Sequence, residues 1–372
     1  MKTVCKLNQC AGCKACVDIC EKNAISVVDS LAVMNAGIDE KLCVKCGACV
    51  RVCPNNSVVK MTPPWQWYQG WVDTTRETSA SGGVAAGLVE SFIKNGGYVA
   101  ACIFLNGEFC FDITNDLTYA KKFVGSKYVK SNPQSIYKKV SEKINAGNKV
   151  MFVGLPCQVA AMKNYIKNGD NLYTVDLICH GSPSPQILKK FLYENKLDIQ
   201  SINELKFRNK ERFGLEFGYY NTRISFDGES DLYTFAFLTA LDYTENCYSC
   251  RYATLDRVSD ITLGDSWGSE LDAEEQKKGI SLILSQTEKG NELLRSTKIE
   301  LRNVDLNKAV DANRQLQRPS EMPTERKIFF KNIDKGFYHA IARCHPKMYY
   351  IRRLKYILHK VNIFRKKGNN DI

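Results

Sequence analysis

The sequence predicts an α/β protein that carries a small α+β domain at its N-terminus and a basic amphipathic helix at its C-terminus. Three observations predict this class: a cysteine motif duplicated near the start, alternating helical and strand-like apolar segments from about residue 76, and ten Lys and Arg against one acidic residue over 335–372. A length of 372 residues suits two or three domains. An apolar content of 44% excludes a disordered chain.

These patterns divide the chain into four segments. A run rich in proline and aromatic residues, PPWQWYQGW, separates the cysteine-rich start from the alternating region and is interpreted as a linker. The predicted segments are the cysteine-rich domain at 1–62, the linker at 63–75, the α/β domain at 76–320 and the basic helical tail at 321–372.

The use of cysteine indicates the compartment. The chain has 16 cysteines, and its start, MKTVCKLNQC, lacks the apolar core of a secretory signal. No apolar run reaches the roughly 18 residues of a membrane span. In a reducing compartment, cysteines bind metals more often than they form disulfides. We therefore expect a cytoplasmic metalloprotein.

The cysteine motif is an internal repeat. Residues 10–20, CAGCKACVDIC, recur at 43–53 as CVKCGACVRVC, and a β-like run follows each copy, at 24–28 and 57–61. The doubled spacing C-x2-C-x2-C-x3-C is typical of bacterial ferredoxins with two 4Fe-4S clusters, in which the fourth cysteine of each run ligates the other cluster. Zinc is the alternative, but zinc sites use pairs of cysteines and not runs of three. The expected ligands are Cys10, Cys13, Cys16 and Cys53 for the first cluster, and Cys43, Cys46, Cys49 and Cys20 for the second.

The alternating region predicts the elements of the larger domain. Asn106-Gly107 between two apolar runs is typical of a hairpin turn, and short apolar runs are typical of buried parallel strands. The expected elements are a hairpin over 98–113, parallel strands over 149–154 and 172–179, helices after the glycine turn at 79–83 and after Pro133, and antiparallel strands over 202–237.

Four further cysteines point to a third metal site. Cys157 follows one predicted parallel strand and Cys179 ends the next, so both thiols should emerge at the same carboxyl edge of the sheet. Cys247 and Cys250 form a C-x2-C pair that can complete a four-thiolate site. The alternatives are two buried thiols beside a zinc-type pair, or a nucleophilic Cys157, for which the sequence offers no matching His and Asn.

Other residues have the chemistry of an anion or ring site. Bare amides and a helix dipole at Ser81, Gly82 and Gly83 favour a phosphate, although a plain N-cap explains the same residues. Lys127 in GSKY suits a phosphate or the electron-rich edge of a flavin, and otherwise is a surface lysine. Within 261–268, Asp265 lies on a turn with Trp267, which can pack on a planar ring or simply fill the core. His180 can donate a proton to a reduced flavin or serve as a hydrogen-bonded loop residue.

Together these motifs carry a family resemblance over about residues 5–290. The sequence contains, in this order, SASGGV, SKYV, GLPCQVA, DLICHGSPSP, FRNKERFG, CYSCRYA, SDITLGDSWG and KGISL, behind the two-cluster ferredoxin motif. It resembles the coenzyme F420 hydrogenase/dehydrogenase beta-subunit family.

The resemblance implies an iron–sulfur flavoprotein with FAD in the α/β domain. It places a third 4Fe-4S cluster on Cys157, Cys179, Cys247 and Cys250. His180 and Lys127 are implied as catalytic residues. The implied flavin-binding residues are Ser81, Gly82, Gly83, Val84, Ser126, Lys127, Tyr128, Asp265 and Trp267.

The sequence also departs from the family pattern. Leu155 stands where Thr or Ser is usual, and Ser266 where an aromatic residue is usual beside Trp267. The chain looks like the stand-alone bacterial members that accompany cell-surface polysaccharide biosynthesis, so the family name does not identify the substrate.

The predicted function is that of an oxidoreductase. Iron–sulfur clusters carry one electron at a time, whereas flavin accepts one or two. Clusters and flavin together can therefore pass electrons between a ferredoxin-like donor or acceptor and a small-molecule substrate, F420 or another. The alternative is a non-catalytic electron-relay subunit that serves a partner enzyme.

The basic tail is predicted as an amphipathic helix over about 347–366. Its apolar stripe and Lys- and Arg-rich face suit peripheral docking at the inner membrane surface or on a protein partner. Packing against the body is the alternative. Nucleic acid is not the expected partner, because no reading module accompanies the basic residues.

Overall fold

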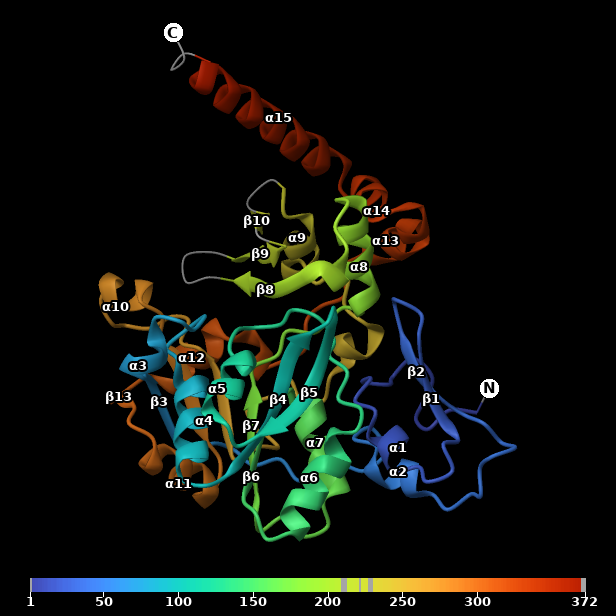
Figure 1. Cartoon of the computed structure of the whole chain (residues 1–372), viewed down its shortest axis with the longest axis vertical. Helices are drawn as coiled ribbons and strands as arrows, with labels where there is room; N and C mark the ends of the chain where they lie inside the picture. Colours follow the sequence, from blue (N-terminus) through green and yellow to red (C-terminus); the bar gives the residue numbers. More distant parts are fainter. Residues whose placement is uncertain (1, 209–212, 221, 227–229, 369–372) are drawn as a thin grey trace.

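The computed structural model describes residues 2–208, 213–220, 222–226 and 230–368, with side chains up to residue 358. Part of the predicted FRNKERFG motif, 209–212, lies outside the described residues. The cysteine-rich unit lies at one side of the α/β body, a smaller sheet with its helices lies above the body, and the C-terminal helix projects away from both (Figure 1).

The cysteine-rich unit confirms the predicted ferredoxin-like start of the chain. Its elements are α1 (Ala15–Asp18), β1 (Ile25–Asp29), β2 (Met34–Ile38) and α2 (Ala48–Val52). The backbone repeats with the sequence: Gly12 and its equivalent Lys45 have φ of 69° and 58°, and Lys14 and its equivalent Gly47 have φ of 56° and 72°. These left-handed turns fold each cysteine run into a loop ahead of its helix.

One expected strand is absent from this unit. The apolar run 57–61 forms no strand, whereas its equivalent in the first copy is β1. β1 pairs antiparallel with β2, a segment of the first half of the unit. The prediction was wrong because a β-like run needs a partner strand with free hydrogen-bonding groups, and β1 has already paired locally.

Within the described residues, the body contains an eight-stranded mixed sheet. Its order is β13-β3-β12-β11-β7-β6-β4-β5. The run β11-β7-β6-β4 is parallel, as predicted for 149–154 and 172–179, and antiparallel strands extend it on both sides. The strands are β3 (Gln66–Trp71), β4 (Tyr98–Leu105), β5 (Glu108–Thr114), β6 (Val150–Gly154), β7 (Leu172–Leu177), β11 (Ile261–Asp265), β12 (Ser281–Ser285) and β13 (Glu300–Arg302).

The predicted linker at 63–75 contains part of this sheet. β3 pairs with β12 and β13, and the short helix α3 (Asp73–Arg76) follows it. The aromatic residues of this segment are compatible with either a packed linker or a strand. Only its pairing with strands more than 200 residues later in the chain shows that it is a strand. The hairpin β4–β5, turned by Asn106 and Gly107, is as predicted.

Helices cover both faces of the sheet. On one face, α4 (Val84–Lys94) and α11 (Glu288–Ser296) pack on alternate strand residues such as Met151 and Val175. On the other face, α6 (Ile136–Asn145) and α7 (Pro156–Tyr165) pack on the intervening residues. Buried side chains of the ferredoxin-like unit belong to this second core, so the unit and the body share one apolar interior.

The smaller unit above the body has a three-stranded antiparallel sheet, β8 (Ile202–Arg208), β9 (Phe213–Tyr219) and β10 (Thr222–Ser225). The predicted strands over 202–237 are wrong at their end, because Leu232–Leu238 forms helix α9. Asp231 caps this helix by accepting the amide of Thr234. The other helices of this unit are α8 (Pro185–Glu194), α13 (Arg326–Asn332) and α14 (Phe337–Cys344).

Only part of the predicted tail is separate from the body. α13 and α14 contribute buried side chains to the core of the smaller unit. α15 (Pro346–Gly368) projects from it and exposes apolar side chains, among them Tyr350 and Leu354. The side chains of 359–366, the last part of the predicted amphipathic helix, lie outside the described residues. No helix in the described part is long and apolar enough to cross a membrane.

Short helices connect these elements. The α-helices are α5 (Leu117–Ala120), α10 (Ala273–Lys277) and α12 (Leu306–Ala312). Single 3-10 turns span Lys121–Phe123, Ile199–Ser201, Glu245–Ser249, Arg314–Leu316 and Ile333–Lys335.

A fully buried carboxyl group makes stability depend on pH. Neither oxygen of Asp242 has a hydrogen-bond partner on another described residue, and burial raises its pKa to about 8 from 3.8. The folded chain therefore retains a proton that the unfolded chain releases, and stability falls as pH rises between these two values.

We expect Asp242→Asn to remove this dependence. The variant should match the wild type near pH 4 and become more stable by about 1.4 kcal/mol for each pH unit above it, up to pH 8. Urea unfolding at several pH values measures the difference. If the free energy of unfolding depended on pH in the same way for both proteins, the raised pKa of Asp242 would be contradicted.

Candidate functional site

The first cysteine set is Cys10, Cys13, Cys16 and Cys53. All four side chains are buried, with 6–7% exposed. They lie within electrostatic reach of one another, and burial followed by these neighbours raises the pKa values of Cys13 and Cys16. A hydrogen bond with the buried Cys5 thiol lowers the pKa of Cys10 to about 6. This packing is consistent with the prediction that Cys53, the fourth cysteine of the second copy, joins three cysteines of the first copy.

The second cysteine set is Cys43, Cys46, Cys49 and Cys20. Cys20 and Cys43 lie within electrostatic reach of Cys49, and Cys46 is exposed. The amide of Lys45 donates to the Cys43 sulfur at 3.4 Å, as the amide of Gly12 does to Cys10 in the first copy. Such amide–sulfur bonds help set cluster potentials, so the repeat preserves the bond as well as the spacing.

The thiols suit cluster ligation by their chemistry and grouping. All 16 cysteines, each within the described residues, are free. Among the described side chains, no three His, Cys, Asp or Glu converge on a single-ion site. Soft thiolates in two sets of four, each drawn from both copies of the repeat, fit 4Fe-4S clusters.

The third cysteine set is Cys157, Cys179, Cys247 and Cys250. Cys157 lies in the first turn of α7 directly after β6, and Cys179 follows β7. Cys247 and Cys250 come from the loop that begins with the 3-10 turn Glu245–Ser249. Burial raises the pKa of Cys179, and the three other members raise it further. The structure thus brings the four predicted residues together at one edge of the sheet.

A buried ion pair holds the loop of this third set in place. Arg257 Nη2 lies 3.0 Å from Asp176 Oδ1 in β7, and both side chains are at most 1% exposed. Arg257 also donates to the carbonyl oxygens of Tyr252 at 2.7 Å and Leu177 at 3.1 Å. One guanidinium therefore ties the chain after Cys250 to the strand that precedes Cys179.

Lys130 joins the first and third cysteine sets. Its side chain is 6% exposed and its Nζ donates to the Ala11 carbonyl at 3.1 Å, between two cysteines of the first set. Its backbone amide donates to Pro183, beyond Cys179, at 2.9 Å. Burial opposes the ammonium charge, but Cys247, Cys157, Cys10 and Cys179 outweigh burial and raise the pKa of Lys130.

Two tyrosines complete this contact. Tyr137 of α6 donates to the Cys13 carbonyl at 2.7 Å, and Tyr252 donates to the Pro54 carbonyl at 3.0 Å. Since Cys16 also lies within electrostatic reach of Cys49, the sets follow one another in space. The second set is outermost, the first lies in the middle, and the third lies in the body.

The predicted phosphate turn lies at the start of β12. A Cβ on Gly82 would lie 2.4 Å from the Gly70 oxygen, so a glycine is required by the close approach to β3. Ser81 Oγ donates to the Ile280 carbonyl at 2.9 Å. Gly83 has a φ of 79° and precedes α4 without a side-chain cap, which leaves first-turn amides for an anion. Val84 is fully buried and packs in the core.

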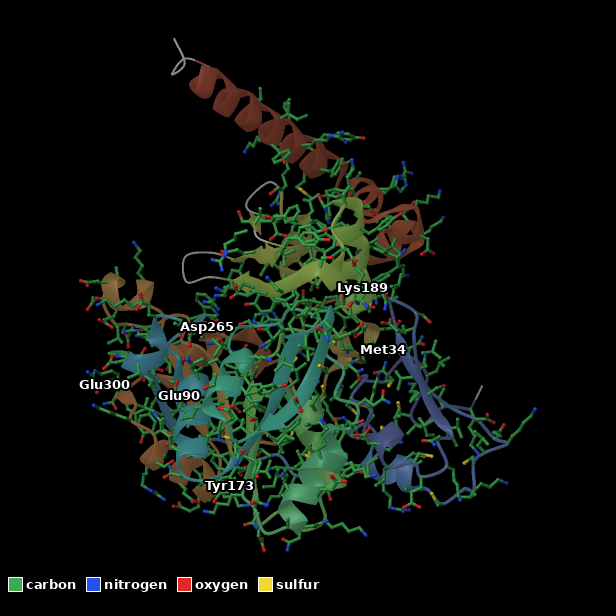
Figure 2. The ribbon with its side chains drawn as sticks, in the orientation of Figure 1. Met34, Glu90, Tyr173, Lys189, Asp265 and Glu300 are labelled. Carbon is green, nitrogen blue, oxygen red and sulfur yellow. The ribbon has the colours of Figure 1, made fainter. Side chains whose placement is uncertain are left out.

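The predicted ring site gathers at the end of β11, where Figure 2 shows Asp265 below the smaller unit. Asp265 Oδ2 lies 2.5 Å from Arg208 Nη1 of β8. The same guanidinium lies 5.5 Å from the ring of Trp267, which is 41% exposed. Tyr128 interacts with both Ser126 and Arg208. Burial lowers the pKa of His180, and nearby Asp265 partly opposes this shift.

Lys127 lies apart from these groups. Its ammonium donates to the carbonyl oxygens of Phe123 at 2.8 Å and Val124 at 3.1 Å, and burial lowers its pKa. The side chain therefore points toward the segment that precedes it. It remains a predicted site residue only on the resemblance.

Sequence reasoning missed Arg208 and Lys130. Arg208 belongs to the FRNKERFG motif, which marked the segment but not the residue. Lys130 follows the SKYV motif by one position, and no local pattern distinguishes it from the many surface lysines. Its role depends on burial between two distant loops.

The chain matches two family models. Residues 147–307 match the model for the C terminus of the coenzyme F420 hydrogenase/dehydrogenase beta subunit, and residues 9–57 match a 4Fe-4S dicluster domain. These matches confirm the predicted resemblance. No curated protein matches the chain.

Several solved chains are similar in structure, and one of them matches at low identity. It is a chain from a xenon derivatization study of the F420-reducing NiFe hydrogenase complex from Methanosarcina barkeri. The two sequences are 17% identical, the TM-score is 0.47, and the match covers 75% of this chain and 97% of that one.

We expect Arg257→Met to destabilise the protein by about 3–5 kcal/mol, because it leaves the carboxylate of Asp176 buried without its partner. Chemical unfolding under anaerobic conditions measures the loss. The double variant Arg257→Met/Asp176→Asn should recover much of it, since no charge is then left buried. A double variant no more stable than the single one would contradict this account.

Proposed function

From a chain that combines a 4Fe-4S dicluster domain with the C-terminal region of F420 hydrogenase/dehydrogenase beta subunits, we propose an iron–sulfur flavoprotein oxidoreductase. It passes electrons between a ferredoxin-like donor or acceptor and a small-molecule substrate, through two N-terminal clusters, a third cluster and FAD. The substrate is F420 or another small molecule, such as one used in cell-surface polysaccharide metabolism.

The observation that carries this proposal is the spatial order of the three cysteine sets. The middle set shares Lys130 with the third set, and the third set reaches the predicted flavin residues through adjacent positions, because His180 follows Cys179. His180 in turn lies within electrostatic reach of Asp265. This arrangement of cysteine sets and predicted flavin residues supports a continuous path for electrons.

The groups supply the redox chemistry when bound: clusters transfer single electrons, and flavin exchanges one or two. The chain's residues hold and tune them. Arg208 is fixed by Asp265 and presents a cation beside Trp267. Burial lowers the pKa of His180 and so favours its neutral imidazole, which can accept a proton next to the third set. The first-turn amides of α4 can receive a phosphate.

Metal and flavin analysis of one anaerobic sample tests the proposal. We expect about twelve irons and one FAD for each chain, since each cubane holds four irons. Cys157→Ala should lose about four irons, whereas Cys344→Ala, at a buried thiol in α14 outside all three sets, should lose none. About eight irons with no flavin after reconstitution would refute the flavoenzyme.

Lys130→Met should lower the midpoint potential of the adjoining clusters by tens of millivolts, because loss of a buried positive charge disfavours the added electron. A tenfold change in the equilibrium constant corresponds to about 59 mV for a one-electron couple. EPR-monitored redox titration measures the shift. Lys130→Arg keeps the charge and should stay near the wild type, and unchanged potentials in the Met variant would exclude an electrostatic role.

A further inference from the structure

The two copies of the cysteine repeat differ in what covers them. In the first copy, Ala11 is 9% exposed and Cys13 7%, because Lys130 and Tyr137 pack over the loop. At the equivalent positions of the second copy, Val44 is 62% exposed and Cys46 is also exposed. The same loop is thus an interface in one copy and a free surface in the other.

The free surface carries exposed apolar side chains. The exposed fractions are 50% for Leu42, 62% for Val44, 44% for Val50 and 66% for Val58. Ser57 Oγ donates to the Val50 carbonyl at 3.4 Å, which brings the segment of Val58 beside α2. Exposed apolar side chains grouped in this way mark interaction sites. We call these four residues, with Cys46, the second-set face.

The rim of the second-set face is basic. Residues 41–51 include Lys41, Lys45 and Arg51 and no acidic residue, and all three are exposed. Arg51 donates to the Cys46 carbonyl at 3.0 Å, so its charge lies at the exposed ligand. The two acidic residues that precede this segment have partners of their own. Asp39 accepts a hydrogen bond from the amide of Lys41 at 2.9 Å, and Glu40 forms an ion pair with Lys2 at 3.8 Å.

We propose that the second-set face docks an acidic protein that carries single electrons. An apolar centre with a charged rim is typical of protein interfaces, and redox complexes are small and steered by complementary charge. This inference rests on the proposed function, because it makes the second cluster the entry point. The reduced carrier loses one electron and this chain gains one at the second set, and no bond forms or breaks.

Stopped-flow reduction of the reconstituted full-length protein tests the proposal. The probe is a reduced, acidic two-cluster bacterial ferredoxin, and reduced methyl viologen is the small-donor control. Lys41→Glu/Lys45→Glu should lower the second-order rate constant with ferredoxin about tenfold or more at low salt, and should not lower the rate with reduced methyl viologen, which is itself a cation. Lys167→Glu/Lys298→Glu, a pair of exposed lysines on the body with the same change in charge, should leave both rates unchanged.

A second variant tests the exposed apolar side chains. Leu42→Ser/Val44→Ser should weaken ferredoxin binding severalfold with the salt dependence retained. Iron content and the viologen rate verify that the clusters are assembled. Ferredoxin rates equal to the wild type in both double variants would overturn the docking proposal, even if electrons reach the flavin. Clusters that are reduced while a bound flavin stays oxidised would instead contradict the proposed function.

Discussion

The buried ion pair between Arg257 and Asp176 is the constraint on which the candidate redox centre depends. A guanidinium with almost no exposed surface must satisfy its donors inside the protein. Arg257 does so with the carboxylate of β7 and with the carbonyl oxygens of two chain segments. This holds the loop of Cys247 and Cys250 against the strand that leads to Cys179. The third cysteine set therefore forms from segments about 70 residues apart.

The apolar core shared by the ferredoxin-like unit and the body also fixes the relative position of the cysteine sets. Side chains of the ferredoxin-like unit and of α6 and α7 belong to one apolar interior, so the unit cannot move freely relative to the sheet. Lys130 crosses the same contact and places a positive charge between the first and third sets. Burial keeps water away from this charge, so its influence on neighbouring sulfur atoms is little screened. The packing that stabilises the fold also orders the redox groups.

Much of the fold followed from local patterns. The duplicated cysteines, the Asn106-Gly107 turn and the two parallel strands were all predictable, because spacing, turn chemistry and apolar runs act within a few residues. Two errors have one cause. Residues 66–71 form a strand and 57–61 do not, because the deciding partner strand, or its absence, lies elsewhere in the chain and local propensity is a weak guide to it. The third error is local: residues 232–238 form a helix that Asp231 caps.

The sequence by itself determined the chemistry: which cysteines are grouped, in what spacing, and hence which metal they suit. The grouping of Cys157 and Cys179 at one sheet edge also followed, since parallel strands end on the same side. Only the tertiary structure decided that Arg208 faces Asp265, that Lys127 donates to the carbonyl oxygens of Phe123 and Val124, and that one copy of the repeat is covered while the other is exposed. These outcomes depend on burial between distant segments, and a linear pattern of residues does not specify which surfaces meet.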